Sequence, residues 1–140
     1  MNRTAIAAAG VALVFGWATA ASAHHSAVQF DFGKSVPIKG VVKEFEAINP
    51  HMRLTLMVNG AKGVHPVEFE GHSTNNMYRN GYRKGMVNIG DTITVNIAPM
   101  RNGTEGGYVV SAVTAKGVFF GAKSTRAQDA AAEAAKAEGK

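Results

Sequence analysis

The chain has 140 residues, of which 46% are hydrophobic, and it contains no cysteine. This composition fits one domain with one core, and it excludes disulfide bonds and any thiolate-bound metal or redox centre. The formal net charge of +5 is modest and scattered, so it does not by itself indicate a nucleic-acid-binding protein.

Residues 1–23 have the organisation of an export signal. Arg3 provides a positive start, an apolar stretch follows, and Ala21-Ser22-Ala23 matches the small-residue pattern of a signal-peptidase site. The apolar stretch is shorter than a membrane-spanning helix requires, which disfavours the alternative of an uncleaved anchor. We therefore expect a soluble periplasmic protein that is cleaved after Ala23, begins at His24 and has no stable membrane insertion.

Alternation of apolar and polar residues predicts strands along most of the remaining chain. A short extended segment at residues 28–32 is expected to add to a sheet edge. The five main strands are predicted at residues 36–46, 52–58, 64–70, 92–98 and 108–118. In the first of them, Gly40 interrupts the alternation and indicates a bulge or a bend. The core candidates around it are Val36, Ile38, Val41, Phe45 and Ile48.

Turn signals separate the first three strands. Asn49-Pro50 predicts a corner before the second strand, because proline disfavours the helical conformation of the residue that precedes it. Asn59-Gly60 predicts a hairpin after that strand. Pro66 cannot donate a ladder hydrogen bond, so the third strand should lie at an edge at this point.

The predicted order is three strands, one short helix and two strands. This is the order of a small OB-like five-stranded β-barrel, an all-β fold in which each strand turns one apolar face toward a shared core. An open β-sandwich is the alternative. Residues 24–121 would form this domain, and the Ala/Lys/Glu-rich residues 122–140 would form a disordered tail because they lack large apolar side chains.

Six short phrases occur in a fixed order along the chain. They are Ala23-His24-His25-Ser26, Phe30-Asp31, Lys39-Gly40-Val41-Val42, Asn49-Pro50-His51, Tyr78-Arg79-x-Gly81-Tyr82-Arg83 and Gly90-Asp91-x-Ile93-x-Val95. Together they resemble a family of small exported bacterial proteins of unknown function. The resemblance covers residues 23–120 and implies a periplasmic β-rich domain, but no activity. Many members carry tryptophan before the corner and in the helix, where this chain has Ala47, Ile48 and Tyr82.

Histidines at the predicted mature terminus and at the Asn-Pro corner form the leading candidate site. Cleavage after Ala23 would give His24 both a free α-amine and an imidazole, and His25 or His51 would add another imidazole. Three nitrogen ligands of this kind suit copper and also fit zinc or nickel. The plainer interpretations are a solvated terminus with His51 bonded to the turn, or a proton switch.

The third predicted strand carries a second cluster. Glu68 and Glu70 share one face of it, and His72 would continue that face if the strand ran on. Two carboxylates and an imidazole can bind a divalent ion or exchange protons. Alternating charge is also typical of the solvent-exposed face of an edge strand, and that interpretation is preferred.

The short helix between the third and fourth strands carries a third cluster. Ser73 or Thr74 can cap the helix at its start. The residues that could bind an anionic or glycan-like partner are Tyr78, Arg79, Tyr82 and Arg83. The simpler interpretation is that Met77 and the tyrosines plug the end of the barrel while the cations face water.

These observations predict a periplasmic binding protein that is not an enzyme. The chain has no nucleophile elbow, phosphate-binding loop, paired catalytic carboxylates or haem-attachment motif, so catalysis is the least supported class. The preferred ligand is a metal ion, copper, bound by His24, His25 and His51. The alternative is an envelope interaction module that binds an anionic or glycan-like partner through the helix cluster.

Overall fold

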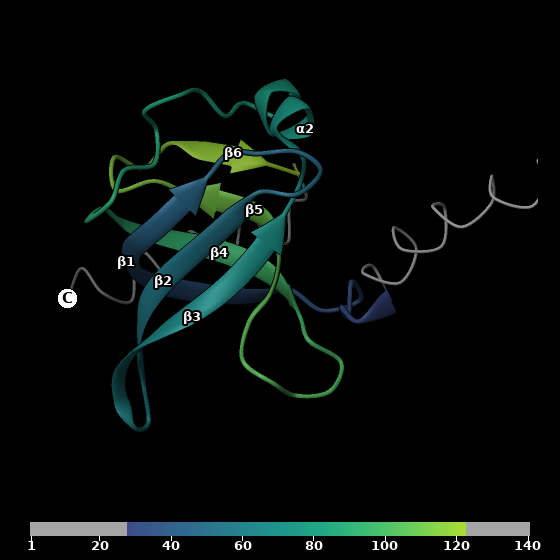
Figure 1. Ribbon diagram of the computed structural model, residues 1–140, viewed down its shortest axis with the longest axis vertical. Coiled ribbons are helices and arrows are strands. Elements are labelled where there is room, and N and C mark those ends of the chain that lie inside the picture. Colours follow the sequence, from purple (N-terminus) through teal and green to yellow (C-terminus); the bar gives the residue numbers. More distant parts are fainter. Residues whose placement is uncertain (1–27, 123–140) are drawn as a thin grey trace, which may run out of the picture.

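The computed structural model describes residues 28–122, which form a β-barrel capped at one end by a short helix (Figure 1). The strands are β1 (Val36–Glu46), β2 (Arg53–Gly60), β3 (Gly63–Gly71), β4 (Thr92–Pro99), β5 (Gly107–Val113) and β6 (Phe119–Gly121). Helix α2 (Thr74–Arg79) lies between β3 and β4. Within residues 28–122, no helix has the length and apolar character needed to cross a membrane.

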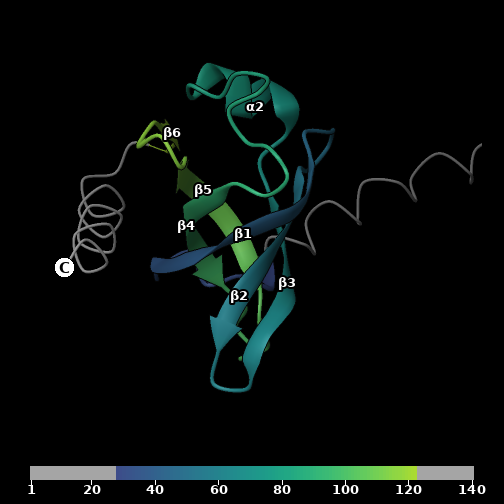
Figure 2. The same cartoon turned by 90° about the vertical axis from the view of Figure 1, so that its left-hand side faces the viewer.

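The sheet closes on itself. Antiparallel neighbours follow the order β3-β2-β1-β4-β5-β6, and a parallel pairing between β3 and β5 joins the two sides. The closed ring is therefore β1-β2-β3-β5-β4, with α2 at one end, which is an OB-like barrel (Figure 2). The predicted fold class is confirmed, and the β3–β5 pairing rules out the open sandwich.

Strand β1 has the predicted bounds, but its inward-facing residues differ from the prediction. The alternation continues through Gly40 to Val42, which is buried, whereas Val41 is 41% exposed. The register against β2 shifts only after Val42, so the bulge lies at Lys43 and not at Gly40. The prediction that Val41 lies in the core was therefore wrong. The inward and outward alternation of side chains changes at Lys43, three residues after Gly40.

Gly40 instead allows two strands to approach closely. A Cβ at this position would lie 2.8 Å from the Met57 carbonyl oxygen and 2.9 Å from the Leu56 Cβ. Because Met57 O belongs to the backbone of β2, a side chain at residue 40 would push β1 away from its neighbour.

One core fills the barrel. It contains the inward faces of β1 to β5 together with Met77 and Tyr82 from the helical region. Of the core residues predicted for the first strand, Val36, Ile38 and Phe45 pack at its margin. Ile48 is 38% exposed and lies outside the core, because β1 ends at Glu46.

The predicted fifth strand is in fact two strands. β5 ends at Val113, and β6 returns antiparallel along it. The reversal is held by the Thr114 amide, which donates to the Val118 carbonyl at 2.9 Å, and Gly117 adopts a φ of +75° that suits glycine. The predicted signal peptide, His24, His25 and most of the predicted tail lie outside the described residues.

Candidate metal site

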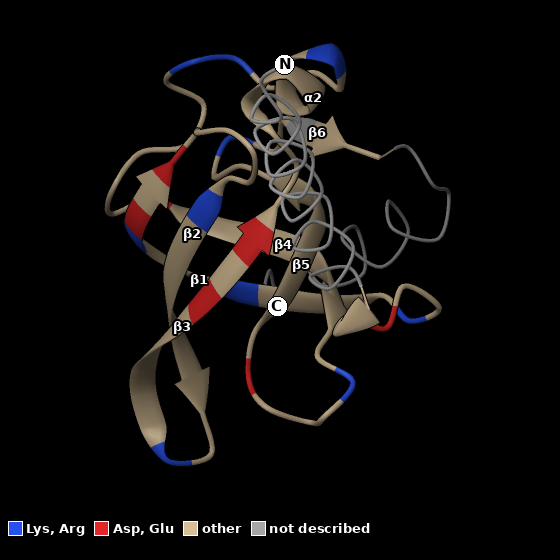
Figure 3. Ribbon diagram, turned by 45° about the vertical axis from the view of Figure 1, so that its right-hand side comes forward, with Lys and Arg blue, Asp and Glu red and all other residues tan. Residues whose placement is uncertain are grey.

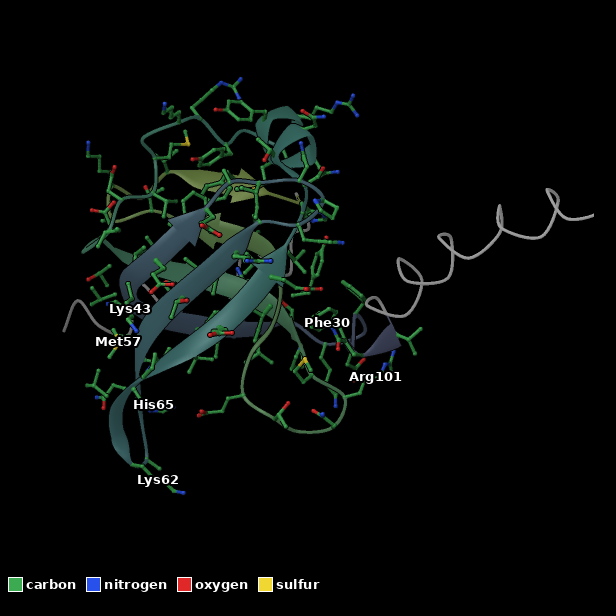
Figure 4. All side chains as sticks on the ribbon, viewed as in Figure 1. Phe30, Lys43, Met57, Lys62, His65 and Arg101 are labelled. Atoms are coloured by element: carbon green, nitrogen blue, oxygen red, sulfur yellow. The ribbon has the colours of Figure 1, made fainter. Side chains whose placement is uncertain are left out.

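The first described residues add to the barrel at the end of β4. Phe30 forms an antiparallel bridge with Met100, and the Arg101 amide donates to the Gln29 carbonyl at 2.8 Å (Figure 4). The Phe30 side chain is only 2% exposed. The predicted edge addition is therefore present, and it holds the N-terminal segment against the barrel wall.

The pairing of β2 with β3 continues beyond the ends of both strands. The ladder pairs Arg53 with Glu70, and the Met52 amide donates to the His72 carbonyl at 3.1 Å. The Gly71 amide in turn donates to the Met52 carbonyl at 3.1 Å, so the register shifts by one residue at this point. His51 and His72 follow this shift, and both are half-buried. Their rings lie 6.3 Å and 5.1 Å from the Tyr108 ring, which brings the two histidines to one place on the barrel.

Each of these imidazoles has one nitrogen in a hydrogen bond. His51 Nδ1 lies 3.0 Å from the Gly71 carbonyl oxygen, so this nitrogen carries the proton. His72 Nδ1 lies 3.0 Å from the Tyr108 hydroxyl. Within residues 28–122, neither Nε2 atom has a hydrogen-bond partner. Histidines that bind metals commonly hold their other ring nitrogen in such a bond, which orients the ring toward the metal.

Tyr108 fixes His72 from β5. The two rings are 5.1 Å apart at an interplanar angle of 89°, and Glu70 pairs with Tyr108 in the β3–β5 ladder. The rings of Phe30 and Phe32 pack on Tyr108 at 5.5 Å and 5.3 Å. Burial raises the pKa of Tyr108, and the nearby Glu70 carboxylate raises it further, so its hydroxyl stays protonated near neutral pH.

His72 is held in its neutral form. Burial lowers the pKa of His72 below its usual value of 6.5, and the positive charge that His51 can carry lowers it further. A neutral imidazole is the form that binds metals, so the surroundings of His72 prepare it as a ligand near neutral pH.

The second predicted cluster lies partly on the outer face of β3. Glu68 and Glu70 alternate with the buried Val67 and Phe69, but β3 ends at Gly71, so the strand does not run on to His72. Glu68 is exposed, which agrees with a solvated strand face, whereas Glu70 is half-buried and its buried Oε1 atom has no hydrogen-bond partner among the described residues.

A broad groove of about 860 Å³ runs along this face. Acidic residues of β1 and β3 follow it (Figure 3). Its carboxylates are Glu44, Glu46, Glu68, Glu70 and Glu105. Among residues 28–122, no three His, Asp or Glu side chains converge to hold a metal by themselves. A metal at the His51–His72 pair would therefore need further ligands.

Residues 12–109 match DUF6152, a family of unknown function. The chain belongs to this family. The matched segment contains His51, His72 and Tyr108. A comparison with curated proteins gave no match. Among solved structures, a crystal structure of the ZRD-deleted mutant of TiaS in complex with agmatine is similar over 66% of this chain, with 17% identity and a TM-score of 0.41. The chain spans 23% of the length of that protein.

The helix cluster of this DUF6152 protein serves mainly to hold the end of the barrel. Tyr82 is 4% exposed and packs against Phe45 and Phe120, so its ring belongs to the core. Arg83 Nη1 donates to the carbonyl oxygens of Tyr78 and Tyr82 at 2.8 Å and 2.6 Å. The Tyr78 ring lies 5.3 Å from the Tyr82 ring and 6.0 Å from Arg83 Cζ, so it joins the same packing although it is exposed. Arg79, the fourth residue predicted to bind a ligand here, is exposed on the surface.

Two members of the site were not among the metal ligands predicted from the sequence. His72 was grouped with the glutamates, and Tyr108 was read only as the start of a strand. The hairpin register provides part of the missing signal, because pairing Gly60 with Gly63 brings Arg53 opposite Glu70 and so places the residues before β2 near those after β3. Tyr108 follows from the parallel β3–β5 pairing, which no local pattern in the sequence indicates.

Proposed function

We propose that this DUF6152 protein is a periplasmic, non-catalytic metal-binding protein and that its preferred ion is copper. The observation that supports this proposal is the pair of His51 and His72, whose rings both lie against the Tyr108 ring, at 6.3 Å and 5.1 Å. Both Nδ1 atoms are engaged, by the Gly71 carbonyl and the Tyr108 hydroxyl, and both Nε2 atoms lack a partner among the described residues. Imidazole nitrogen is a preferred ligand of copper and also of zinc.

The N-terminal residues would complete the coordination. The Phe30 ring lies 5.5 Å from the Tyr108 ring, which lies 5.1 Å from the His72 ring. Phe30 lies six positions after His24, and an extended chain of that length reaches up to about 20 Å. The α-amine and imidazole of a mature His24, or the imidazole of His25, are therefore within reach of the pair and would supply a third and a fourth nitrogen.

The surrounding charge favours a cation. The groove along β1 and β3 is lined by five glutamates and one arginine, Arg53, and one of these glutamates, Glu70, pairs with Tyr108. Negative potential of this kind raises the local concentration of cations. Glu70 Oε1 is buried and has no hydrogen-bond partner among the described residues. Glu70 pairs with Tyr108, whose hydroxyl lies 3.0 Å from His72 Nδ1. A metal ion bound by His51 and His72 would therefore offset the uncompensated negative charge of Glu70.

The test is Cu(II) uptake by the chain that begins at His24, followed by native mass spectrometry and competition titration near neutral pH. We expect one copper per chain, with affinity reduced by His51→Ala and by His72→Ala. His65→Gln is the matched control, because His65 is bonded elsewhere and should leave affinity unchanged. Absence of uptake, or equal affinity in all three variants and the parent chain, would contradict the proposal.

The contribution of the terminus needs a separate variant. One alanine added before His24 converts the α-amine into an amide and leaves every imidazole in place. We expect this variant to bind copper more weakly than the parent chain while His51→Ala still weakens it further. Equal affinity with and without the added alanine would remove the amine from the site, and the histidine pair would remain.

A further inference from the structure

His65 joins two segments that are far apart in the sequence. It lies on β3 beside the tip of the β2–β3 hairpin, where Lys62 is located (Figure 4). Its Nε2 atom is 2.8 Å from Oε2 and 3.0 Å from Oε1 of Glu105, in the loop between β4 and β5. Its Nδ1 atom is 3.0 Å from the Gly63 carbonyl oxygen.

The chemistry of these contacts specifies a protonation state. Both ring nitrogens of His65 face oxygen atoms that can only accept, namely the Gly63 carbonyl and the Glu105 carboxylate. A neutral imidazole carries one N–H and can donate to one of them, whereas an imidazolium carries two and donates to both. The observed arrangement is therefore that of a charged histidine, and deprotonation must break one contact.

The ring has little freedom to adopt another position on the hairpin. A Cβ built on Gly60 would lie 2.7 Å from the His65 Cε1 atom, so the imidazole packs directly over the Gly60 backbone. The charged groups that act on the ring are Glu105 and Lys62. The Gly63 carbonyl and then Glu105 raise the pKa of His65 above 6.5, and the Lys62 charge opposes them.

We propose that His65 is a protonation-dependent clamp that fastens the 101–106 loop to the β2–β3 hairpin. The loop is anchored at its base, where the Arg101 amide donates to the Gln29 carbonyl. The other end of the loop enters β5, where Gly107 pairs with Phe69 of β3 and Pro99 of β4. Between these two anchors the clamp holds Glu105, which lines the groove together with Glu68 and Gly106. Loss of the proton releases this part of the groove wall while both anchors stay attached, so the groove widens there as pH rises. This inference does not depend on metal binding.

Amide hydrogen exchange of the full chain between about pH 5 and pH 8.5, expressed as protection factors, tests the clamp. The reporters are the loop amides, such as Gly103, which donates to the Met100 carbonyl at 3.2 Å. An exposed ion pair is weak, so its loss should change protection by only a few-fold. We expect protection in the loop to fall by about two- to fivefold, at the same pH as the His65 Cε1 signal titrates.

Glu105→Gln is the decisive variant, and Glu68→Gln is its control. The glutamine keeps one possible hydrogen bond to His65 but removes the charge, so we expect a lower His65 midpoint and a smaller change in loop protection. Glu68→Gln removes a charge from the same face without touching His65 and should behave like the parent. The proposal would be overturned if loop protection stayed constant through the His65 titration. It would also be overturned if loop protection changed with pH in Glu105→Gln as much as it does in the parent chain.

Discussion

Replacement of Tyr108 by phenylalanine isolates the contact that orients His72. The substitution removes one oxygen atom and keeps the ring, so the packing against Phe30 and Phe32 is preserved. The hydroxyl that lies 3.0 Å from His72 Nδ1 is lost, and His51 with its bond to Gly71 is unaffected. The variant therefore weakens the support of one ligand without deleting either ligand.

The expected effect on metal affinity follows from this geometry. Loss of a group that orients a metal-bound histidine typically costs about 10- to 100-fold in affinity. That range corresponds to about 1.4–2.8 kcal/mol. The effect on folding should be smaller, about 0.5–1.5 kcal/mol for one hydrogen bond. Competition titration with Cu(II) measures the first quantity, and urea unfolding without metal measures the second.

Tyr78→Phe is the matched control for this prediction. It makes the same chemical change at an exposed tyrosine on α2, whereas the hydroxyl that bonds His72 is that of Tyr108. We expect it to leave copper affinity within about twofold of the parent, since no ligand or orienting bond is altered. Affinity that is unchanged in Tyr108→Phe, or reduced equally by both substitutions, would refute the orienting role of Tyr108.

Three further predictions concern folding. Gly40→Ala should destabilise the protein by about 1–3 kcal/mol, because the added methyl group meets the Met57 carbonyl of β2, and an unchanged urea midpoint would show that the strands can separate without cost. Met77→Ala should lower the free energy of unfolding by about 2–5 kcal/mol, since this side chain is 4% exposed in the core. A thermal unfolding midpoint equal to that of the parent would show that Met77 does not stabilise the barrel. Because the pKa of His72 is lowered in the folded state, the free energy of unfolding should decrease as pH falls from 6.5 through the lowered pKa. His72→Gln should make the free energy of unfolding depend less on pH, as measured by urea unfolding between about pH 4 and pH 7.

Much of the barrel could be predicted from local patterns. The strict alternation of Ile93, Val95 and Ile97 identified β4, and all three side chains are buried. The errors arose where backbone geometry departs from simple alternation. The Lys43 bulge moved the change of phase in β1, and a turn inside an apolar run divided one predicted strand into β5 and β6. Apolar periodicity cannot reveal a reversal whose turn residues are themselves compatible with a strand.

The candidate site was predictable only in part, for a similar reason. His51 was recognised because the Asn-Pro corner fixes the start of a strand. The approach of His72 depends on the hairpin register and on the shift of one residue at Met52, and local alternation reveals neither. Tyr108 joins the site through a contact between β3 and β5 that appears only when the barrel closes.

The most direct test of the metal site is a histidine-selective NMR titration of the chain beginning at His24 with Cu(II). The chain has five histidines, so each Cε1 signal can be followed separately. Paramagnetic broadening at substoichiometric copper should remove the signals of His51 and His72, together with those of His24 or His25, while the His65 signal persists. Signals of His51 and His72 that stay sharp while the N-terminal signals disappear would contradict the site, since the metal would then be held by the terminus alone.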